Sequence, residues 1–338
     1  MILRLEIENF RGRQVRTIVT CAETQALGNP VTWITGAHSI GKTTVVEALL
    51  FLQFIARGMT RVDQYCNGDG YSISANPVWP VDINIAFVMD GFQYLYGIRL
   101  EYEGMRHWQV ENEWVKVNGG LIFSRSGNHV EIGNPDGGVS YELDRSVFVL
   151  PTFATQDANH PVARVRGYLA NLFVIIPTPS HFSDVIISGA SQNYLDPYGR
   201  NIGAWSVAFF GVNMSAYPWF VGLLARYISG FDSLKTVAVA HGRNTRLSLV
   251  RRRADGTSFE TPLSMASYRE KLIFTGCLLM AVRQTFGNIS CVWDDFDQMV
   301  EASSSLASEL HDTFVRQGQL VFTSARNCGF QNVRIQQI

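Results

Sequence analysis

One short stretch near the start of the chain has the residue types and spacing of a phosphate-binding loop. Gly36 and Gly41 are followed directly by Lys42 and Thr43, so the stretch matches the pattern G-x-x-x-x-G-K-[ST] at every defined position. In this pattern backbone N–H groups turn inward around phosphates, the lysine reaches the β- and γ-phosphates, and the hydroxyl holds Mg²⁺. The predicted nucleotide-binding residues here are Gly36, Ala37, His38, Ser39, Ile40, Gly41, Lys42, Thr43 and Thr44.

The residues on either side predict the elements that this chemistry requires. Positions 31–35 are a short run of β-formers, and positions 43–54 carry apolar residues at helical spacing. A loop that follows a strand and opens a helix presents the positive end of that helix to an anion. The motif therefore stands in the context expected of a phosphate site. His38 occupies a variable position of the loop, and no other histidine or cysteine stands at metal-ligand spacing from it.

Two adjacent carboxylates, Asp294 and Asp295, follow the apolar run 289–293. A phosphate-binding loop works with an acidic residue on a neighbouring strand that helps to hold Mg²⁺. We predict that Asp294 supports Mg²⁺ together with Thr43, and that Asp295 is the catalytic base that orients the attacking water, with Lys42 as the second catalytic residue. The alternative is an acidic pair that only caps the next helix.

Hydrophobic patterning predicts an α/β chain around these motifs. The first ten residues alternate as a half-buried strand, and Asp-Gly and Asn-Gly turns divide residues 81–150 into an antiparallel meander. Residues 160–230 have a mostly helical pattern. The remaining predictions are a hairpin over 234–260 that turns at 254–257, a helix over 268–286, and buried parallel strands at 289–293 and 319–323.

Composition excludes several classes of protein. The chain has 338 residues, of which 46% are hydrophobic and 17% charged, so it is a folded protein rather than a disordered one. The formal net charge of −1 gives no global attraction to DNA or to anionic membranes. The longest near-apolar run, 272–282, is short of the ~20 residues of a membrane helix. Without a signal peptide or a Cys-x-x-Cys motif, the sequence predicts a cytoplasmic protein with reduced thiols and no membrane contact.

Taken in order, several stretches resemble the RecF/SMC/OLD-like group of ABC-type ATPases. Glu8-Asn9-Phe10-Arg11 resembles the opening of these proteins, and the phosphate-binding loop with its helix resembles theirs. Residues 262–269, Pro-Leu-Ser-Met-Ala-Ser-Tyr-Arg, lie where the group carries its Leu-Ser-x-Gly signature. Asp294 and Asp295 lie at the position of the group's acidic motif, and residues 322–326 lie at the switch-histidine position. The resemblance extends over nearly the whole chain.

The resemblance implies a P-loop NTPase of ABC-ATPase head type, an α/β fold whose mixed sheet carries an antiparallel β arm and an inserted helical lobe. Residues 1–338 would form a single head, with a nucleotide-binding core of 1–57 and 234–338, an arm of 80–150 and a helical lobe of 151–233. The resemblance also implies ATP and Mg²⁺ as cofactors, with ATP favoured over GTP on this ground alone.

The same resemblance implies contacts with phosphate from two further places. Arg11 would approach the phosphates of its own copy. Ser264 and Ala266, at the signature, would act in trans on the ATP of a second copy. The chain is therefore expected to form a homodimer or higher oligomer that closes on ATP.

Three departures from the group's pattern imply slow hydrolysis. Ala266 replaces the signature glycine, Asp295 replaces a glutamate with a side chain one methylene longer, and Ala325 replaces the switch histidine. No heptad run of SMC length is present, which excludes a long coiled-coil rod. We also expect no room for a nuclease domain after the last motif.

Three functions remain open at this point. The chain could regulate or scaffold a separate effector protein, a nuclease or toxin, in a bacterial antiphage defence complex. It could be a RecF-like DNA-binding ATPase of repair or maintenance, or a nucleotide-locked assembly scaffold with little turnover. A basic cluster bears on the second function, as a contact for nucleic acid or as the charged edge of an exposed hairpin. Its members are Arg243, Arg246, Arg251, Arg252 and Arg253.

Overall fold

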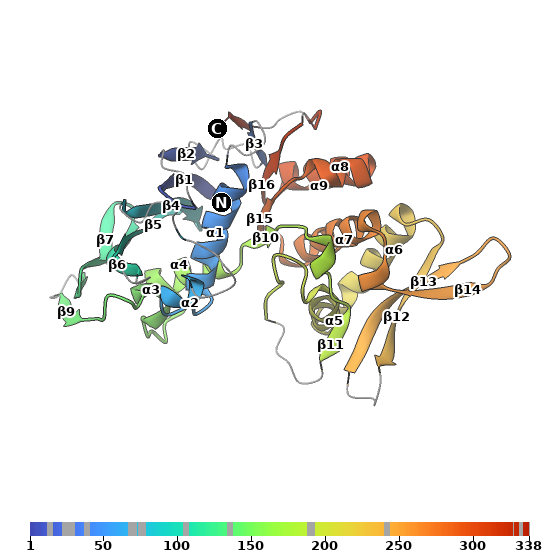
Figure 1. Cartoon of the computed structure of the whole chain (residues 1–338), viewed down its shortest axis with the longest axis horizontal. Coiled ribbons are helices and arrows are strands. Elements are labelled where there is room, and N and C mark those ends of the chain that lie inside the picture. The colour runs from blue at the N-terminus through green and yellow to red at the C-terminus, as the bar shows by residue number, and fades with distance from the viewer. Residues whose placement is uncertain are drawn as a thin grey trace. The chain divides into compact units, whose positions relative to one another are not determined.

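The chain forms two compact units in the computed structural model (Figure 1). One unit holds Met1–Leu172 with Arg334–Ile338, and the other holds Phe173–Val333. The structure describes residues 1–11, 16–21, 31–36, 41–66, 73, 79–103, 108–133, 138–187, 193–239, 244–326, 328–330 and 334–337.

The first unit is built on an antiparallel sheet with the strand order β2-β1-β4-β5-β6-β7-β8-β9. Its strands are β1 (Ile2–Glu8), β2 (Thr17–Thr20), β4 (Val81–Met89), β5 (Phe92–Tyr102), β6 (Trp108–Val117), β7 (Gly120–Ser126), β8 (His129–Ile132) and β9 (Val139–Glu142). Every second residue of β4 from Val81 to Phe87 is buried, as alternation predicts. The meander predicted from the sequence is confirmed, and β1 and β2 extend it.

Two of its hairpin turns show why the sequence breaks where it does. Asp90 and Gly91 both have positive φ, 51° and 82°, and Asn118 and Gly119 have φ of 49° and 84°. Two consecutive residues with positive φ are the geometry of the two-residue turn that matches strand twist, and Asp-Gly and Asn-Gly adopt it most readily. The turn residues therefore fix the pairing of β4 with β5 and of β6 with β7.

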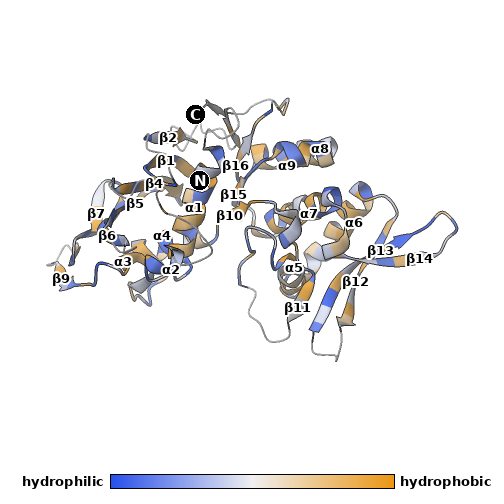
Figure 2. Ribbon diagram, viewed as in Figure 1, coloured by the Kyte–Doolittle hydropathy of each residue, from blue (hydrophilic) through white to orange (hydrophobic). Residues whose placement is uncertain are grey.

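Helices complete the first unit: α1 (Lys42–Ala56), α2 (Asp63–Cys66), α3 (Val149–Thr152) and α4 (Pro161–Ala170). A separate strand, β3 (Val31–Thr35), pairs in parallel with β17 (Arg334–Gln337). In the core, the Phe51 ring of α1 lies 5.9 Å from Phe10 and 6.1 Å from Phe148, measured between ring centroids. Tyr168 of α4 stacks on Phe87 of β4 at 4.1 Å. Figure 2 shows the hydrophobic residues that α1 brings to this core.

The second unit contains three parallel strands in the order β10-β15-β16. These are β10 (Phe173–Ile175), β15 (Ser290–Trp293) and β16 (Gln319–Ser324). All of β16 and the last three residues of β15 are buried, which confirms the two parallel strands predicted from their apolar runs. The predicted helix at 268–286 is α7 (Tyr268–Phe286), which begins at a capping box formed by Ser267 and Glu270. Helices α8 (Asp297–Ala302) and α9 (Ser304–Arg316) connect β15 to β16.

A smaller antiparallel sheet lies in the same unit, with β13 (Asn244–Arg252) at its centre. On one side it pairs with β12 (Phe231–Val239), and on the other with β11 (Val185–Ile187) and then β14 (Ser258–Pro262). The turn predicted at 254–257 joins β13 to β14. A short 3₁₀ turn, η4 (Leu263–Met265), follows β14 and precedes α7.

The region predicted as mostly helical is only partly so. Within 160–230 the structure has α4, α5 (Ile202–Val212) and α6 (Tyr217–Tyr227), together with the strands β10 and β11 and irregular chain. Prolines at 177, 179 and 197 remove backbone donors there and interrupt helix. Phe209, Phe210 and Phe220 of the two later helices are buried, so these aromatic side chains belong to the core.

The helices and cysteines add two findings. In the described ranges no single helix has the length and apolar composition of a membrane span, and α5 and α6 reach that composition only as a pair bent by 110°.

Of the described cysteine side chains, Cys21, Cys277 and Cys291 are buried and Cys328 is half-buried, and all four are free thiols. Burial raises the pKa of the Cys277 and Cys291 thiols far above the ordinary range, which keeps them protonated.

The close approach of β5 and β6 at Gly97 predicts how substitutions of glycine change the stability of the first unit. Gly97 faces Trp114 across the strand pair, and a Cβ at this position would lie 2.1 Å from the indole ring and 2.3 Å from Asn84 Oδ1. Gly97→Ala should therefore lower the free energy of unfolding by about 3 kcal/mol or more, as overpacking does. Gly167→Ala, in α4 with open space around it, should instead stabilise by about 0.5–1 kcal/mol. Urea unfolding of both variants checks this, and equal effects would contradict it.

Candidate nucleotide site

The described part of the predicted phosphate-binding loop consists of Gly36 on one side and Gly41, Lys42, Thr43 and Thr44 on the other. Gly41 caps α1 in the left-handed conformation, with φ of 95°, which a residue with a Cβ rarely adopts. Lys42 is 7% exposed, and its Nζ donates to the carbonyl oxygen of Gly36 at 2.9 Å. This hydrogen bond joins the two described ends of the predicted loop. Thr43 is exposed on the first turn of α1 and Thr44 is half-buried, while the predicted residues Ala37, His38, Ser39 and Ile40 lie outside the described residues.

Arg11, predicted at the phosphates, forms an ion pair with Glu47 of α1. Glu47 stands one helical turn beyond Thr43 on the same helix, so the pair ties the end of the β1 segment to α1. Arg11 has φ of 51°, and its backbone N–H donates to the carbonyl oxygen of Ile73 at 2.6 Å. Its side chain is 23% exposed.

The acidic pair lies in the second unit, where β15 ends. Asp294 is 3% exposed, and its backbone N–H donates to Ile175 of β10 at 2.8 Å. The hydroxyl of Thr323 on β16 donates to Asp294 Oδ1 at 2.5 Å and accepts from the backbone N–H of Asp295 at 2.8 Å. One threonine side chain thus joins both members of the pair. A buried carboxylate needs such a donor, since leaving it unpaired is costly.

Asp295 is held by a polar chain that reaches α7. The backbone of Asp295 has φ of 49°, which turns the chain sharply between β15 and α8. Gln298 Nε2 lies 3.5 Å from Asp295 Oδ2, and the Tyr268 hydroxyl donates to the Gln298 side-chain oxygen. Burial and the charges of Asp295 and Asp297 raise the pKa of Tyr268 to about 12, so this phenol remains a donor at neutral pH.

The predicted signature residues lie in the turn η4 and just after it, at the start of α7. Ser264 donates its hydroxyl to Asp184 Oδ2 at 2.8 Å. Ala266 is 6% exposed, whereas Met265 is 75% exposed. Ala325, at the predicted switch position, is half-buried directly after β16.

Two solved structures match nearly the whole of the chain. An SMC head bound to the C-terminal winged-helix domain of ScpA is 12% identical, with 98% of this chain and 91% of that chain covered and a TM-score of 0.51. The head of the Pyrococcus furiosus Smc with an extended coiled coil, bound to the C-terminal domain of ScpA, is 10% identical, with the same coverage and a TM-score of 0.50. The chain has the fold of an SMC head. No protein-family model and no curated protein matches the sequence.

The SMC-head fold is the mixed α/β, ABC-type head predicted from the sequence. Sequence reasoning did not find three side chains that support the acidic pair: Thr323, Gln298 and Tyr268. Thr323 stands two residues before Ala325, and its place near the end of an apolar run is the only signal that could have indicated it.

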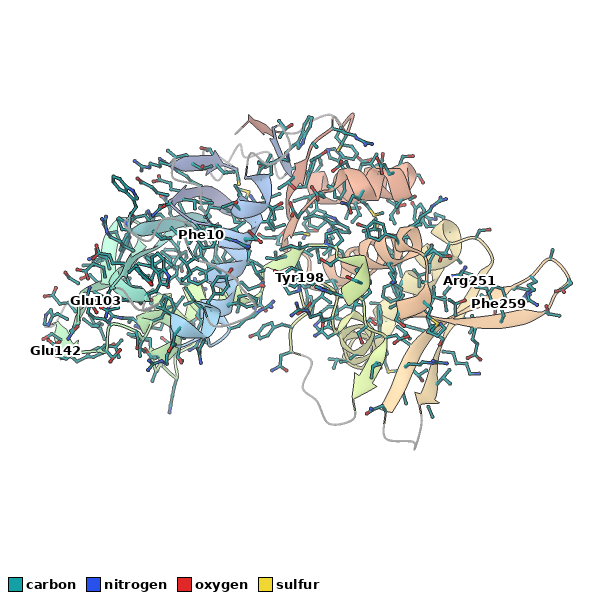
Figure 3. All side chains as sticks on the ribbon, viewed as in Figure 1. Phe10, Glu103, Glu142, Tyr198, Arg251 and Phe259 are labelled. Carbon is teal, nitrogen blue, oxygen red and sulfur yellow. The ribbon has the colours of Figure 1, made fainter. Side chains whose placement is uncertain are left out.

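Two of the five arginines of the basic cluster pair with acids in this SMC-head fold. Arg251 pairs with Glu270 at 2.8 Å, and Arg252 pairs with Asp232 at 2.7 Å. Arg253 lies over the Phe259 ring at 4.9 Å; Figure 3 labels Arg251 and Phe259 on the hairpin of β13 and β14. Arg246 is half-buried on β13, and Arg243 lies outside the described residues. Two of the predicted phosphate contacts are therefore already engaged in ion pairs.

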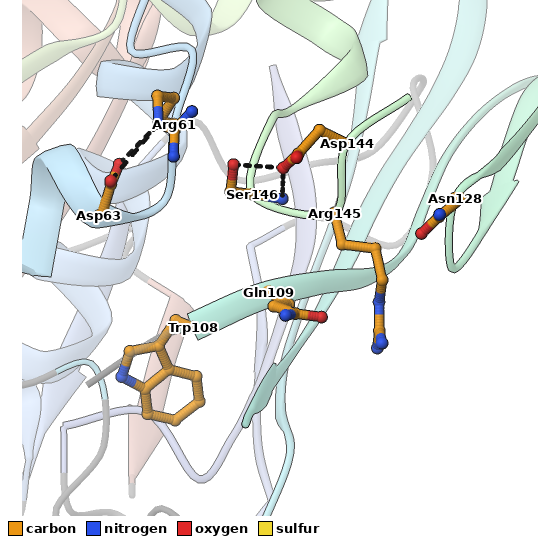
Figure 4. A pocket seen from close by; sticks show the side chains of 8 residues that line it. All are labelled: Arg61, Asp63, Trp108, Gln109, Asn128, Asp144, Arg145 and Ser146. Carbon is orange, nitrogen blue, oxygen red and sulfur yellow. Dashed lines mark hydrogen bonds and ion pairs between the residues drawn. The ribbon is translucent and has the colours of Figure 1, made fainter. Parts of the chain in front are cut away.

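A polar pocket of about 360 Å³ lies in the first unit, apart from the phosphate-binding loop (Figure 4). Its wall includes the ion pair of Arg61 with Asp63, and Asp144, which accepts from the backbone and hydroxyl of Ser146. These polar groups satisfy one another, and none of the lining residues belongs to the predicted site.

The double role of Thr323 yields a test. Thr323→Val keeps the shape of the side chain but removes the donor to Asp294 and the acceptor for Asp295. The free energy of unfolding should fall by about 1–3 kcal/mol, because a buried carboxylate oxygen loses its partner. Thr323→Ser should recover most of the loss.

Thr285→Val is the matched control, since that hydroxyl donates only to the Ala281 carbonyl within α7 and is half-buried. It should change stability by less than about 0.5 kcal/mol. Chemical denaturation measures all three variants, and an equal loss in Thr323→Val and Thr285→Val would refute the bridging role.

Proposed function

We propose that this chain binds ATP with Mg²⁺ and hydrolyses it slowly. The observation that supports this most directly is the hydrogen bond from Lys42 Nζ, at the N-terminus of α1, to the carbonyl oxygen of Gly36. An anion that enters there meets an ammonium, the N-terminal N–H groups of a helix and a glycine with positive φ. A carbonyl oxygen is a weak partner for this ammonium, and a phosphate oxygen would replace it.

We propose that Thr43 and Asp294 are the side chains that would hold a magnesium ion, because each carries an oxygen ligand of the kind that Mg²⁺ takes. Mg²⁺ takes oxygen ligands and is usually held by one or two protein side chains together with substrate phosphates and water. Thr43 offers an exposed hydroxyl in the first unit, and Asp294 offers a carboxylate in the second. When bound, the ion neutralises charge on the phosphates.

Asp295 is the residue proposed to orient and deprotonate the attacking water. Gln298 and the protonated Tyr268 form the polar chain that limits how its carboxylate can turn. The aspartate side chain is one methylene shorter than the glutamate usual in the ABC-type group. Together with Ala266 and Ala325, it supports an enzyme of weak turnover.

Two substitutions test this proposal through phosphate release from Mg·ATP. Lys42→Ala should abolish nucleotide binding and turnover together. Asp295→Asn should leave ATP binding intact and reduce turnover by on the order of 10²–10⁴-fold, the size of a lost general base. Lys235→Ala and Asp232→Asn, which remove the same charges from exposed ion pairs, should retain full activity. ATP binding that survives Lys42→Ala would remove the basis of the proposal.

We further propose that two copies pair on ATP, with Ser264 and Ala266 of one copy facing the nucleotide of the other. The pair would then hold or license a separate effector protein, of nuclease or toxin type, in a bacterial antiphage defence complex. The two SMC heads named above were solved with ScpA domains bound, so a protein partner is compatible with this fold. Arg251 and Arg252 already pair with acids of the chain, so a phosphate of DNA would have to compete with those acids.

Purification of the chain from its native cells tests the partner proposal. A nuclease or toxin should co-purify with the wild-type protein and be depleted from Lys42→Ala, while duplex DNA should bind weakly and without dependence on Arg253. Salt-sensitive DNA binding that is lost in Arg253→Ala, with no protein partner retained, would instead support the RecF-like alternative. Tight ATP occupancy without phosphate release would support the locked scaffold.

A further inference from the structure

The donors of the signature serine are directed at an acid of the same unit. The Ser264 hydroxyl donates to Asp184 Oδ2 at 2.8 Å, and the backbone N–H of Ser264 lies 3.4 Å from the same oxygen. A hydroxyl and an adjacent backbone N–H that converge on one anionic oxygen form the arrangement in which a phosphate oxygen is commonly bound. The carboxylate of Asp184 therefore takes the place that a phosphate would need.

The backbone of Asp184 is fixed from two sides. Its carbonyl oxygen accepts from the backbone N–H of Leu247 on β13 at 2.9 Å. Gly203 of α5 packs against it so closely that a Cβ there would lie 2.8 Å from the Asp184 Cα. Asp184 is also only 5% exposed. Because its main chain cannot retreat, only rotation of its side chain or loss of its charge can release Ser264.

The cations near Ser264 are already matched by acids. Lys271 of α7 is 8% exposed, and burial lowers its pKa while the charge of Asp184 acts to raise it. At the start of α7, Glu270 accepts from both the hydroxyl and the backbone N–H of Ser267 and pairs with Arg251. The positive end of α7 and the nearby ammonium thus face internal carboxylates. An incoming phosphate has to compete with both acids.

We propose that Asp184 is an internal anion that occupies the phosphate-contacting donors of Ser264 and opposes engagement of Ser264 with the nucleotide of a second copy. This inference rests on the ATP-dependent pairing proposed above. Asp184 weakens that pairing because its negative charge stands where the γ-phosphate must approach, and two like charges at contact distance repel.

We call this opposition of Asp184 to pairing the gate. Asp184→Asn tests it, because asparagine keeps the shape and an acceptor oxygen but lacks the charge. Sedimentation velocity with Mg²⁺ and a non-hydrolysable ATP analogue should show tighter dimers. We expect a roughly tenfold fall in the dissociation constant for each site, hence about 100-fold for a symmetric dimer with two sites. Asp232→Asn removes the same charge from an exposed pair of the same unit and should leave the dissociation constant unchanged.

A double variant separates the gate from a general effect of charge. In a Ser264→Ala background, Asp184→Asn should tighten the dimer clearly less than it does in the wild-type background, because the hydroxyl is absent and only the charge repulsion is relieved. An equal tightening in both backgrounds would show a general effect of charge and overturn the role of Ser264. Asp184→Ser, which is neutral and smaller, replaces Asp184→Asn if the latter fails to fold by circular dichroism.

Dimers of unchanged or lower stability in a folded Asp184 variant overturn the gate, as does the absence of any dimer in both wild type and variant. Binding of the analogue to the monomer, measured separately with Lys42→Ala as reference, reports on the proposed function itself. Loss of that binding in the wild type would overturn the nucleotide site, whereas normal binding with no effect of Asp184 would overturn the gate alone.

Discussion

The acidic half of the site depends on one hydroxyl group. β15 is an apolar strand that ends in two carboxylates, and Asp294 is almost completely removed from water. Burying an ionised carboxylate is unfavourable unless donors compensate it. Thr323 supplies one such donor and also accepts from the backbone of Asp295, so β16 fixes both residues at once. The register of β15 with β16 and the sharp turn at Asp295 both contribute to this arrangement.

The parts of the structure that the sequence predicted well are specified by local chemistry. Gly41 and Lys42 mark a helix start that only glycine caps easily, and the Asp90-Gly91 and Asn118-Gly119 turns have the backbone angles that these residue pairs favour. The capping box at Ser267 similarly marks the first residue of α7. Each signal spans only a few neighbouring residues, so it can be recognised without knowledge of the rest of the fold.

The parts that could not be predicted depend on contacts between residues distant in sequence. The basic cluster of β13 looked available for phosphate because its acidic partners, Asp232 and Glu270, stand on other elements. The contact of Asp184 with Ser264 spans 80 positions and leaves no pattern in the chain. Residues 160–230 have helix-like apolar spacing, but prolines and pairing with other strands override that preference. Tertiary context decides such cases, as it does for propensity in general.

The lengths of the outer strands in the first unit have a consequence for solubility. The eight-stranded sheet ends at β2 on one side and at β9 on the other, and each of these strands has four residues. A long, flat edge would offer a row of unpaired amides to other chains and promote aggregation. Here the long strands β4, β5 and β6 are all interior, so the strongest templates for strand addition are paired within the molecule.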